Sequence, residues 1–288
     1  MTASGPGSAA SAAPGSPGQN EAGHAPWLLP GGPLELPGRG TTFVRLQRAE
    51  AGAPTVLLLH GLGVTADANW FPAYPPLAER YGVVAIDHRG HGRGIRSPEP
   101  VRLADCADDA IAALDMLGIE RAIVVGYSMG GPIAQLMWHR HHPRVAGLVL
   151  CATSHRFRGL EPMRDMGPST LRRLRSTTTP ASRRARLDPG LRRWLAGELA
   201  LTDRRRAMQA GFSLARFDSS TWIGRVDVPH AVVVTTRDAA VAPARQRRLA
   251  AALPSASVHE AAIDHTGCVT RPAIFVPALL DALADVSR

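Results

Sequence analysis

The stretch IVVGYSMGGPIAQ, residues 123–135, decides how this chain is interpreted. It begins as a continuous apolar run and breaks at Gly126. Ser128 then stands between Gly126 and Gly130, before an apolar pattern with helical spacing resumes. A buried strand, a tight turn and a helix in this order are typical of folds in which strands and helices alternate. Serine alone is a common turn residue and a weak nucleophile, so its meaning depends on residues elsewhere in the chain.

Short apolar runs recur along the chain and alternate with amphipathic segments. The runs predicted to form strands are residues 41–47, 55–60, 82–87, 122–126, 145–151, 230–236 and 257–263. The segments predicted to form helices are residues 105–117, 129–141, 244–253 and 273–284. Near-continuous apolar runs indicate strands that are buried on both faces of a parallel sheet. The pattern therefore predicts an α/β fold with a mostly parallel central sheet flanked by helices.

Two segments depart from this alternation. Residues 1–38 are predicted to form a disordered tail, because residues 1–25 are rich in Gly, Ser, Ala and Pro and contain no Lys or Arg. Residues 152–225 have no strand-like run but hold helical patterns at 169–175, 191–201 and 204–212. We expect residues 39–151 and 226–288 to form the core, and residues 152–225 to form a helical cap over one end of its sheet.

Arginine carries all of the positive charge. The chain has 33 basic residues, none of them lysine, and a net charge of +9. Residues 151–225 hold 16 arginines against six acidic residues, so the rest of the chain is close to neutral. This composition fits a solvated surface, but it also fits an anionic partner such as an acyl carrier, a carboxylate-bearing substrate or an acidic lipid surface. Few aromatic residues accompany the arginines and no nucleic-acid-binding motif is recognisable, which argues against nucleic acid as a partner.

The remaining composition bears on location and chemistry. No apolar run approaches the roughly 20 residues that span a bilayer, and residues 1–25 lack the basic start and apolar centre of a secretion signal. Cys106, Cys151 and Cys268 share no spacing typical of disulfides or metal sites. We therefore expect a cytoplasmic protein with reduced thiols and no metal or organic cofactor. The sequence does not define its oligomeric state.

A serine nucleophile needs a base and a carboxylate that orients the base. Asp238 directly follows the predicted strand 230–236, and His265 follows the last predicted strand. The carboxyl ends of parallel strands meet at one edge of a sheet, so Ser128, Asp238 and His265 are expected to converge there. Asp227 precedes its strand and is therefore expected at the opposite edge.

A developing oxyanion needs two hydrogen-bond donors. The first candidate is the backbone N–H of Met129, directly after Ser128 at the start of the predicted helix. The second is the N–H of Leu62, in the turn HGLG (60–63) that ends the strand 55–60.

Together these motifs resemble the α/β-hydrolase family over about residues 40–285. The resemblance is carried by HGLG (60–63), DHRGHG (87–92), GYSMGG (126–131), TTRDAAVAP (235–243) and IDHTG (263–267). It implies a serine hydrolase that cleaves carboxylic esters through an acyl-enzyme intermediate. Ser128 would be the nucleophile, His265 the base and Asp238 its orienter, with Leu62 and Met129 as oxyanion donors.

Other activities use the same three residues. Amide, thioester and carbon–carbon bond hydrolysis, perhydrolysis, acyl transfer and non-catalytic ligand binding all stay open as alternatives. Ser128 argues against relatives that use an aspartate nucleophile, and HGLG lacks the proline-containing turn that we associate with carbon–carbon hydrolases. Asp264 departs from the family pattern, which has glycine there in many members. Its carboxylate either raises the pKa of His265 or is solvated and inert.

Aromatic residues beside the oxyanion turn and in the cap are candidates for an acyl pocket. We expect a small-molecule ester with an acyl chain of medium length. The candidate pocket residues are Trp70, Phe71, Trp194, Phe212 and Trp222.

Overall fold

The computed structural model describes residues 25–157 and 187–288. Within these ranges eight strands form one sheet, in the order β1-β2-β4-β3-β5-β6-β7-β8. The pairs β1–β2 and β2–β4 are antiparallel and all other pairs are parallel, which confirms the predicted mostly parallel sheet. The strands are β1 (Gly31–Leu36), β2 (Gly40–Gln47), β3 (Thr55–Leu59), β4 (Gly82–Ile86), β5 (Ala122–Tyr127), β6 (Val145–Cys151), β7 (His230–Thr235) and β8 (Ser257–Ala261).

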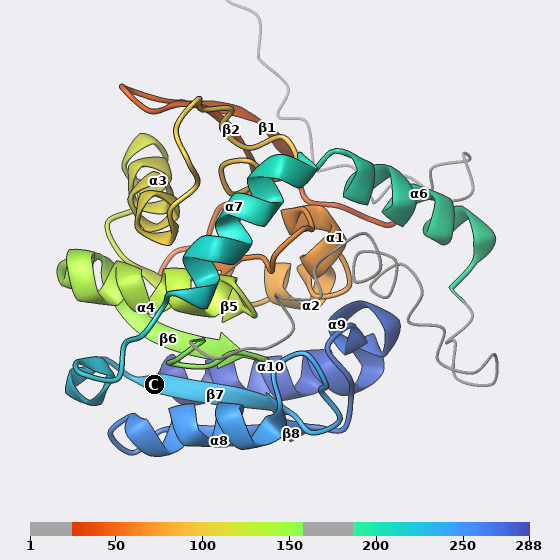
Figure 1. The fold of residues 1–288 in the computed structure, drawn as a ribbon. Coiled ribbons are helices and arrows are strands. Elements are labelled where there is room, and N and C mark those ends of the chain that lie inside the picture. Colours follow the sequence, from red (N-terminus) through yellow and green to blue (C-terminus); the bar gives the residue numbers. More distant parts are fainter. Residues whose placement is uncertain (1–24, 158–186) are drawn as a thin grey trace, which may run out of the picture.

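Helices cover both faces of the sheet (Figure 1). On one face α3, α4 and α8 pack against one set of strand side chains, and on the other α1, α2 and α10 pack against the alternate set. The α-helices of the described ranges are α1 (Ala66–Trp70), α2 (Tyr74–Ala78), α3 (Leu103–Met116), α4 (Gly130–His141), α6 (Pro189–Ala200), α7 (Arg204–Ala215), α8 (Pro243–Ala252), α9 (Gly267–Thr270) and α10 (Pro272–Val286). Short 3₁₀ helices lie at His142–Arg144 and Ile223–Arg225. None of these helices is long and apolar enough to cross a membrane.

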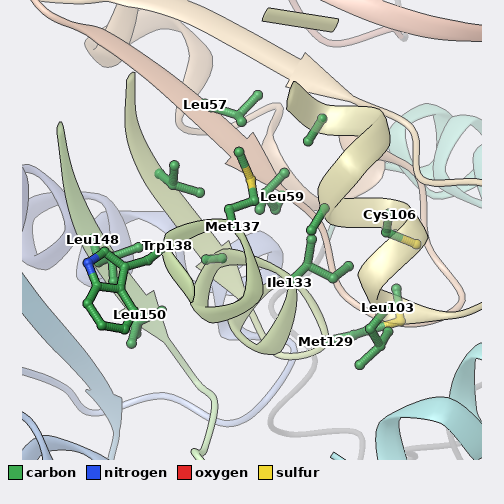
Figure 2. Packing of buried hydrophobic residues seen from close by; sticks show 14 of the residues in the cluster. Leu57, Leu59, Leu103, Cys106, Met129, Ile133, Met137, Trp138, Leu148 and Leu150 are labelled. Carbon is green, nitrogen blue, oxygen red and sulfur yellow. The ribbon is translucent and has the colours of Figure 1, made fainter. Parts of the chain in front are cut away.

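The position of α4 follows from its apolar stripe. Met129, Ile133 and Met137 recur every four residues, so they share one face, and all three are fully buried. Figure 2 shows this face packed in the cluster that holds Leu57 and Leu59 of β3. Because Met129 directly follows Ser128, this packing also fixes where the turn between β5 and α4 lies.

The predicted disordered tail, residues 1–38, is wrong at its C-terminal end, which contains a strand. Gly31–Leu36 forms β1, which pairs antiparallel with β2 at the edge of the sheet. The sequence GGPLEL resembles a loop because of its glycines and Pro33, but an edge strand tolerates a proline that a central strand would exclude. Residues 1–24 lie outside the described residues, as does the predicted cap helix at 169–175. The other predicted cap helices, 191–201 and 204–212, correspond to α6 and α7.

The two cap helices contact loops that follow β3 and β4. Glu198 of α6 accepts a hydrogen bond from the Thr65 hydroxyl at 2.6 Å, and it pairs with Arg93 at 3.2 Å. Arg206 of α7 donates to the carbonyl of Glu99 at 2.9 Å. Burial raises the pKa of the Glu198 carboxyl above its ordinary value, although the hydrogen bond from Thr65 and the charge of Arg93 oppose this. Polar contacts therefore join the inserted cap to the carboxyl edge of the sheet.

Three buried histidines join the loops after β3 and β4. The rings of His60 and His88 lie 4.2 Å apart, and those of His60 and His91 lie 5.4 Å apart. The His88 backbone N–H donates to His60 Nε2, so His60 Nδ1 carries the proton and donates to the Gly61 carbonyl at 2.7 Å. Burial lowers the pKa of His60 to about 4, that of His91 to about 3, and that of His88 well below its ordinary value. The cluster is therefore neutral near pH 7.

Replacing Leu148 with alanine should lower the free energy of unfolding by about 3 kcal/mol, because the side chain is fully buried in β6 and leaves a cavity. The matched substitution Leu199→Ala, at a residue 44% exposed on α6, should cost less than about 1 kcal/mol. Urea denaturation of both variants gives the two values. Equal losses would contradict the described core.

The histidine cluster should make the fold sensitive to acid. In the folded protein the pKa values of His60 and His91 lie below those of histidine in the unfolded chain. Below about pH 6.5 the unfolded chain therefore binds protons that the folded protein does not, and stability that is present above about pH 6.5 is lost as the pH falls toward 4. In the variant His91→Gln, one histidine that takes up a proton on unfolding is absent. Its unfolding free energy should decline less steeply than that of wild type between pH 6.5 and 4.5, by up to about 1.4 kcal/mol per pH unit. Denaturation curves at a series of pH values measure both slopes, and parallel slopes would contradict the assignment.

Candidate active site

Ser128 lies in the turn between β5 and α4 with a backbone φ of 52°. Few residues other than glycine adopt this left-handed conformation, so neighbouring contacts must impose it. The Ser128 N–H donates to the carbonyl of Cys151 at 2.9 Å. Its carbonyl accepts from the Thr153 hydroxyl at 2.7 Å and from the Gly131 N–H at 3.0 Å. These bonds hold the strained turn from both sides.

The glycines around Ser128 are required by close backbone approach. A Cβ on Gly126 would lie 2.3 Å from the carbonyl oxygen of Gly130, and a Cβ on Gly130 would lie 2.1 Å from that of Leu59. A Cβ on Gly131 would lie 2.3 Å from the Thr153 hydroxyl oxygen. No real Cβ tolerates such distances. The turn therefore packs too tightly for any side chain at these three positions.

The structure brings Ser128, His265 and Asp238 together in one hydrogen-bonded series. His265 Nε2 lies 2.9 Å from Ser128 Oγ, and His265 Nδ1 lies 2.7 Å from Asp238 Oδ2. Ser128 and Asp238 are buried, with 8% and 4% of their surface exposed, whereas the His265 side chain is 22% exposed. The imidazole can therefore take a proton from the serine hydroxyl while its other nitrogen is held by the carboxylate.

Asp238 is held by bonds to both carboxylate oxygens. Oδ2 accepts from the Thr235 hydroxyl at 2.8 Å and from Gln246 Nε2 at 3.3 Å, in addition to His265. Oδ1 accepts from the backbone N–H groups of Ala240 and Val241, at 2.8 and 2.9 Å. These partners fix the plane of the carboxylate opposite the imidazole.

The loop that carries His265 is tied to the serine turn. The Tyr127 hydroxyl donates to the His265 carbonyl at 3.0 Å, and burial raises the pKa of Tyr127 well above its ordinary value, so it stays a donor. Asp264 points to other partners. Its Oδ1 accepts from the backbone N–H and the hydroxyl of Thr266, at 2.9 and 2.8 Å, in an exposed turn. Asp264 thus shapes the loop through Thr266.

The predicted oxyanion loop lies against the serine. A Cβ built on Gly61 would lie 3.4 Å from Ser128 Cβ, so this loop passes close to the serine side chain. The Gly61 N–H donates to Asn69 Oδ1 at 3.0 Å, which anchors this loop to α1. The N–H groups of Leu62 and Met129 donate to no acceptor in the described part of the chain. The oxyanion role of these two N–H groups stays a prediction.

The predicted pocket residues fall into three groups. Trp70 is fully buried between Tyr127 and Phe275, at ring distances of 6.0 and 6.3 Å, so its assignment to the pocket was wrong and it is a core residue. Trp222 was also assigned wrongly. It stacks on His139 at 4.3 Å, at the far end of α4, which lies about 15 Å along the helix from Ser128.

The other three pocket candidates stay predictions. Phe71 and Trp194 meet edge to face, with ring centroids 5.2 Å apart, where α6 of the cap approaches α1. Phe212 is 51% exposed on α7. The Phe71–Trp194 pair is the aromatic contact that joins the cap to the loop after β3.

Sequence reasoning missed the residues that hold the site. Tyr127 stands beside the serine in the chain, but nothing in the sequence says that its hydroxyl reaches the His265 loop. Asn69 and Gln246 lie within helices of ordinary composition, and Thr153 lies in a loop. Their partners are distant in sequence or set by loop geometry, so periodicity carries no signal for them.

The three cysteines offer no competing nucleophile. Cys106, Cys151 and Cys268 are free and buried, and burial raises the pKa of each thiol, to about 12 for Cys268. Across the described ranges, no three His, Cys, Asp or Glu side chains are placed to hold a metal ion.

Comparison with known proteins places the chain in a family. A family model described as alpha/beta hydrolase fold matches residues 54–202. A protein of Caulobacter segnis named "Putative carbamate hydrolase RutD" is 41% identical over 102 residues, 35% of this chain. That match covers 38% of the relative, so this chain spans well under half the length of the relative.

Solved structures with lower sequence identity to this chain have the same fold. A hydrolase from Pseudomonas aeruginosa superposes with a TM-score of 0.76 at 24% identity, over 92% of this chain and 99% of that one. An enol-lactonase from Burkholderia xenovorans superposes with a TM-score of 0.74 at 24% identity, over 88% of this chain and all of that one. Since the family model spans more than half of the sequence and the sheet order places Ser128 at a strand-to-helix turn, the chain belongs to the α/β-hydrolase fold family.

Proposed function

We propose that this protein is a serine hydrolase that cleaves carboxylic esters through an acyl-enzyme intermediate. The observation that carries the proposal is the continuous series from Ser128 Oγ to His265 Nε2 at 2.9 Å and from His265 Nδ1 to Asp238 Oδ2 at 2.7 Å. A serine, an imidazole and a carboxylate at these distances form the arrangement that activates a hydroxyl for acyl transfer.

The first half of the reaction transfers the acyl group to the protein. The Ser128 hydroxyl attacks the ester carbonyl, and His265 Nε2 takes its proton. Asp238 holds the Nδ1–H and stabilises the imidazolium that forms. The N–H groups of Leu62 and Met129 donate to the developing oxyanion, and one such donor contributes roughly 3 kcal/mol. His265 then gives its proton to the departing alcohol.

The second half releases the acid. Water enters beside His265, whose side chain is the most exposed of the three, and loses a proton to Nε2 as it attacks the acyl carbonyl. Collapse of the second oxyanion returns the proton to Ser128 Oγ and frees the carboxylic acid. The cap helices and the Phe71–Trp194 pair would line the acyl side of such a site.

Carbamates are a second substrate class, favoured by one observation. The relative named as a carbamate hydrolase is 41% identical over 102 residues, which are 35% of this chain. A carbamate presents the same electrophilic carbonyl to a serine, so the residue roles would not change. The ester and carbamate proposals therefore differ in the leaving group and in the groups that contact it.

Ser128→Ala should lower kcat/KM on p-nitrophenyl esters by at least about 10⁴-fold, because no other nucleophile is activated in the site. Esters of increasing acyl length and a p-nitrophenyl carbamate are compared with the same protein preparations. Ser287→Ala is a suitable control, since its hydroxyl donates to the Leu283 carbonyl near the end of α10, and it should keep the wild-type rate. If the folded wild type turns over none of these substrates, the hydrolase proposal fails. If Ser128→Ala keeps the wild-type activity, the assignment of Ser128 as the nucleophile is wrong.

Asp238→Asn should lower kcat by about 10³- to 10⁴-fold with little change in KM. The amide cannot hold the Nδ1–H tautomer of His265, whereas substrate binding is not affected. Steady-state kinetics on the best ester measures both parameters, and circular dichroism checks that the buried loop still folds. A loss confined to KM would contradict the role of Asp238 as the residue that orients the base.

A further inference from the structure

A cavity opens beside the loop that follows β6. Its volume is about 280 Å³, and its walls come from that loop, from the segment that precedes the 3₁₀ helix at Ile223–Arg225, and from α8. The lining residues are Ser154, His155, Arg156, Ser220, Arg245 and Arg248. None of them belongs to the site described above.

This cavity lies next to the elements that hold the catalytic series. Thr153 donates to the Ser128 carbonyl, and Ser154 follows it one peptide later, with Cα atoms about 3.8 Å apart. On the other side Gln246 contacts Asp238, and Arg245 precedes Gln246 on α8. The cavity thus lies beside segments that follow the carboxyl ends of β6 and β7.

The side chains around the cavity leave it positively charged. Arg156 pairs with Asp218 at 3.3 Å, and Arg245 donates to the backbone carbonyl of Arg156 at 3.3 Å. Arg248 has no hydrogen bond or ion pair with the described residues. Among the described side chains at this cavity, three arginines face one aspartate, so two positive charges stand in excess.

His155 lies close enough to this group of charges for its pKa to respond to them. Burial lowers the pKa of His155 most, the charge of Asp218 opposes this, and the charges of Arg156 and Arg248 lower the pKa further. The two serines do not supply free hydroxyl donors. Ser154 Oγ donates to the Arg156 carbonyl at 3.1 Å, and Ser220 Oγ donates to Asp218. A ligand would therefore meet guanidinium groups and His155, whose buried Nδ1 has no hydrogen-bond partner among the described residues.

We propose that this cavity binds a phosphate group, as inorganic phosphate or as the monoester of a larger molecule. Planar guanidinium forks match pairs of phosphate oxygens, and an excess of two positive charges matches a dianion. A carboxylate would neutralise only half of that excess. The volume is below the 300 Å³ at which sites for whole drug-sized ligands begin, so it suits a small anion or the phosphorylated end of a ligand.

The test is calorimetric titration of inorganic phosphate into the full chain at low ionic strength. Wild type should bind one phosphate saturably, with a Kd below about 1 mM. Arg248→Gln and Arg245→Gln should each weaken binding at least tenfold. The matched control is Arg247→Gln on the same helix, which pairs with Glu260 at 2.7 Å and does not line the cavity, and it should bind as wild type does. Absence of saturable binding, or equal weakening in Arg247→Gln, would overturn the proposal.

A second arm identifies the source of the phosphate and does not depend on the first. An ester that carries a phosphomonoester is compared with a neutral ester of the same size. A lower KM for the phosphorylated ester in wild type, lost in Arg248→Gln, assigns the group to the substrate; equal KM values assign the cavity to free phosphate. Ser128→Ala should still bind inorganic phosphate, so failure of the hydrolase proposal and failure of this one give different results.

Discussion

The close approach of two backbones, at Gly130 and Leu59, sets the geometry on which the site depends. A single added carbon at Gly130 would lie 2.1 Å from the Leu59 carbonyl oxygen, so nothing larger than hydrogen fits between the start of α4 and the end of β3. This contact holds the Ser128 turn against the loop that carries Leu62. The proposed nucleophile and both candidate oxyanion donors are thereby positioned by the packing of one helix on one strand. The buried stripe Met129, Ile133 and Met137 supplies the free energy that keeps the helix there.

Polar residues around the site hold its side chains and loops in place through hydrogen bonds. Asp238 takes hydrogen bonds from Thr235, Gln246 and two backbone N–H groups, and Tyr127 holds the loop of His265. Asn69 and the neutral His60 hold Gly61 from opposite sides, one at its N–H and one at its carbonyl. A buried imidazole that stays neutral does this without adding charge beside the proposed oxyanion position. The positions of Ser128, His265 and Asp238 therefore depend on several further residues, as expected for a catalytic site in which a fraction of an ångström changes the rate.

Much of this arrangement could be predicted from the sequence, because it rests on short-range patterns. Continuous apolar runs predicted seven strands, and the turn GYSMGG together with the positions of Asp238 and His265 after their strands predicted which side chains meet. The edge strand β1 was missed because glycines and a proline obscure its pattern. Trp70 and Trp222 were misplaced since an aromatic residue in the sequence carries no sign of whether it faces core or cleft. Gln246, Asn69 and the arginine-lined cavity beside β6 depend on contacts between distant segments, for which a single sequence carries no periodic signal.

The left-handed backbone at Ser128 has an evolutionary consequence. The turn fixes the location of the reactive side chain through backbone contacts, so it does not specify which atom stands there. Aspartate is among the residues that tolerate a positive φ best, and its side chain is close to serine in reach. Replacing this one residue would thus exchange the proposed serine nucleophile for a carboxylate without remodelling the strand or the helix. Backbone contacts fix the position of the residue, and its side chain determines the reaction. A fold of this kind can therefore acquire a new activity while its architecture stays the same.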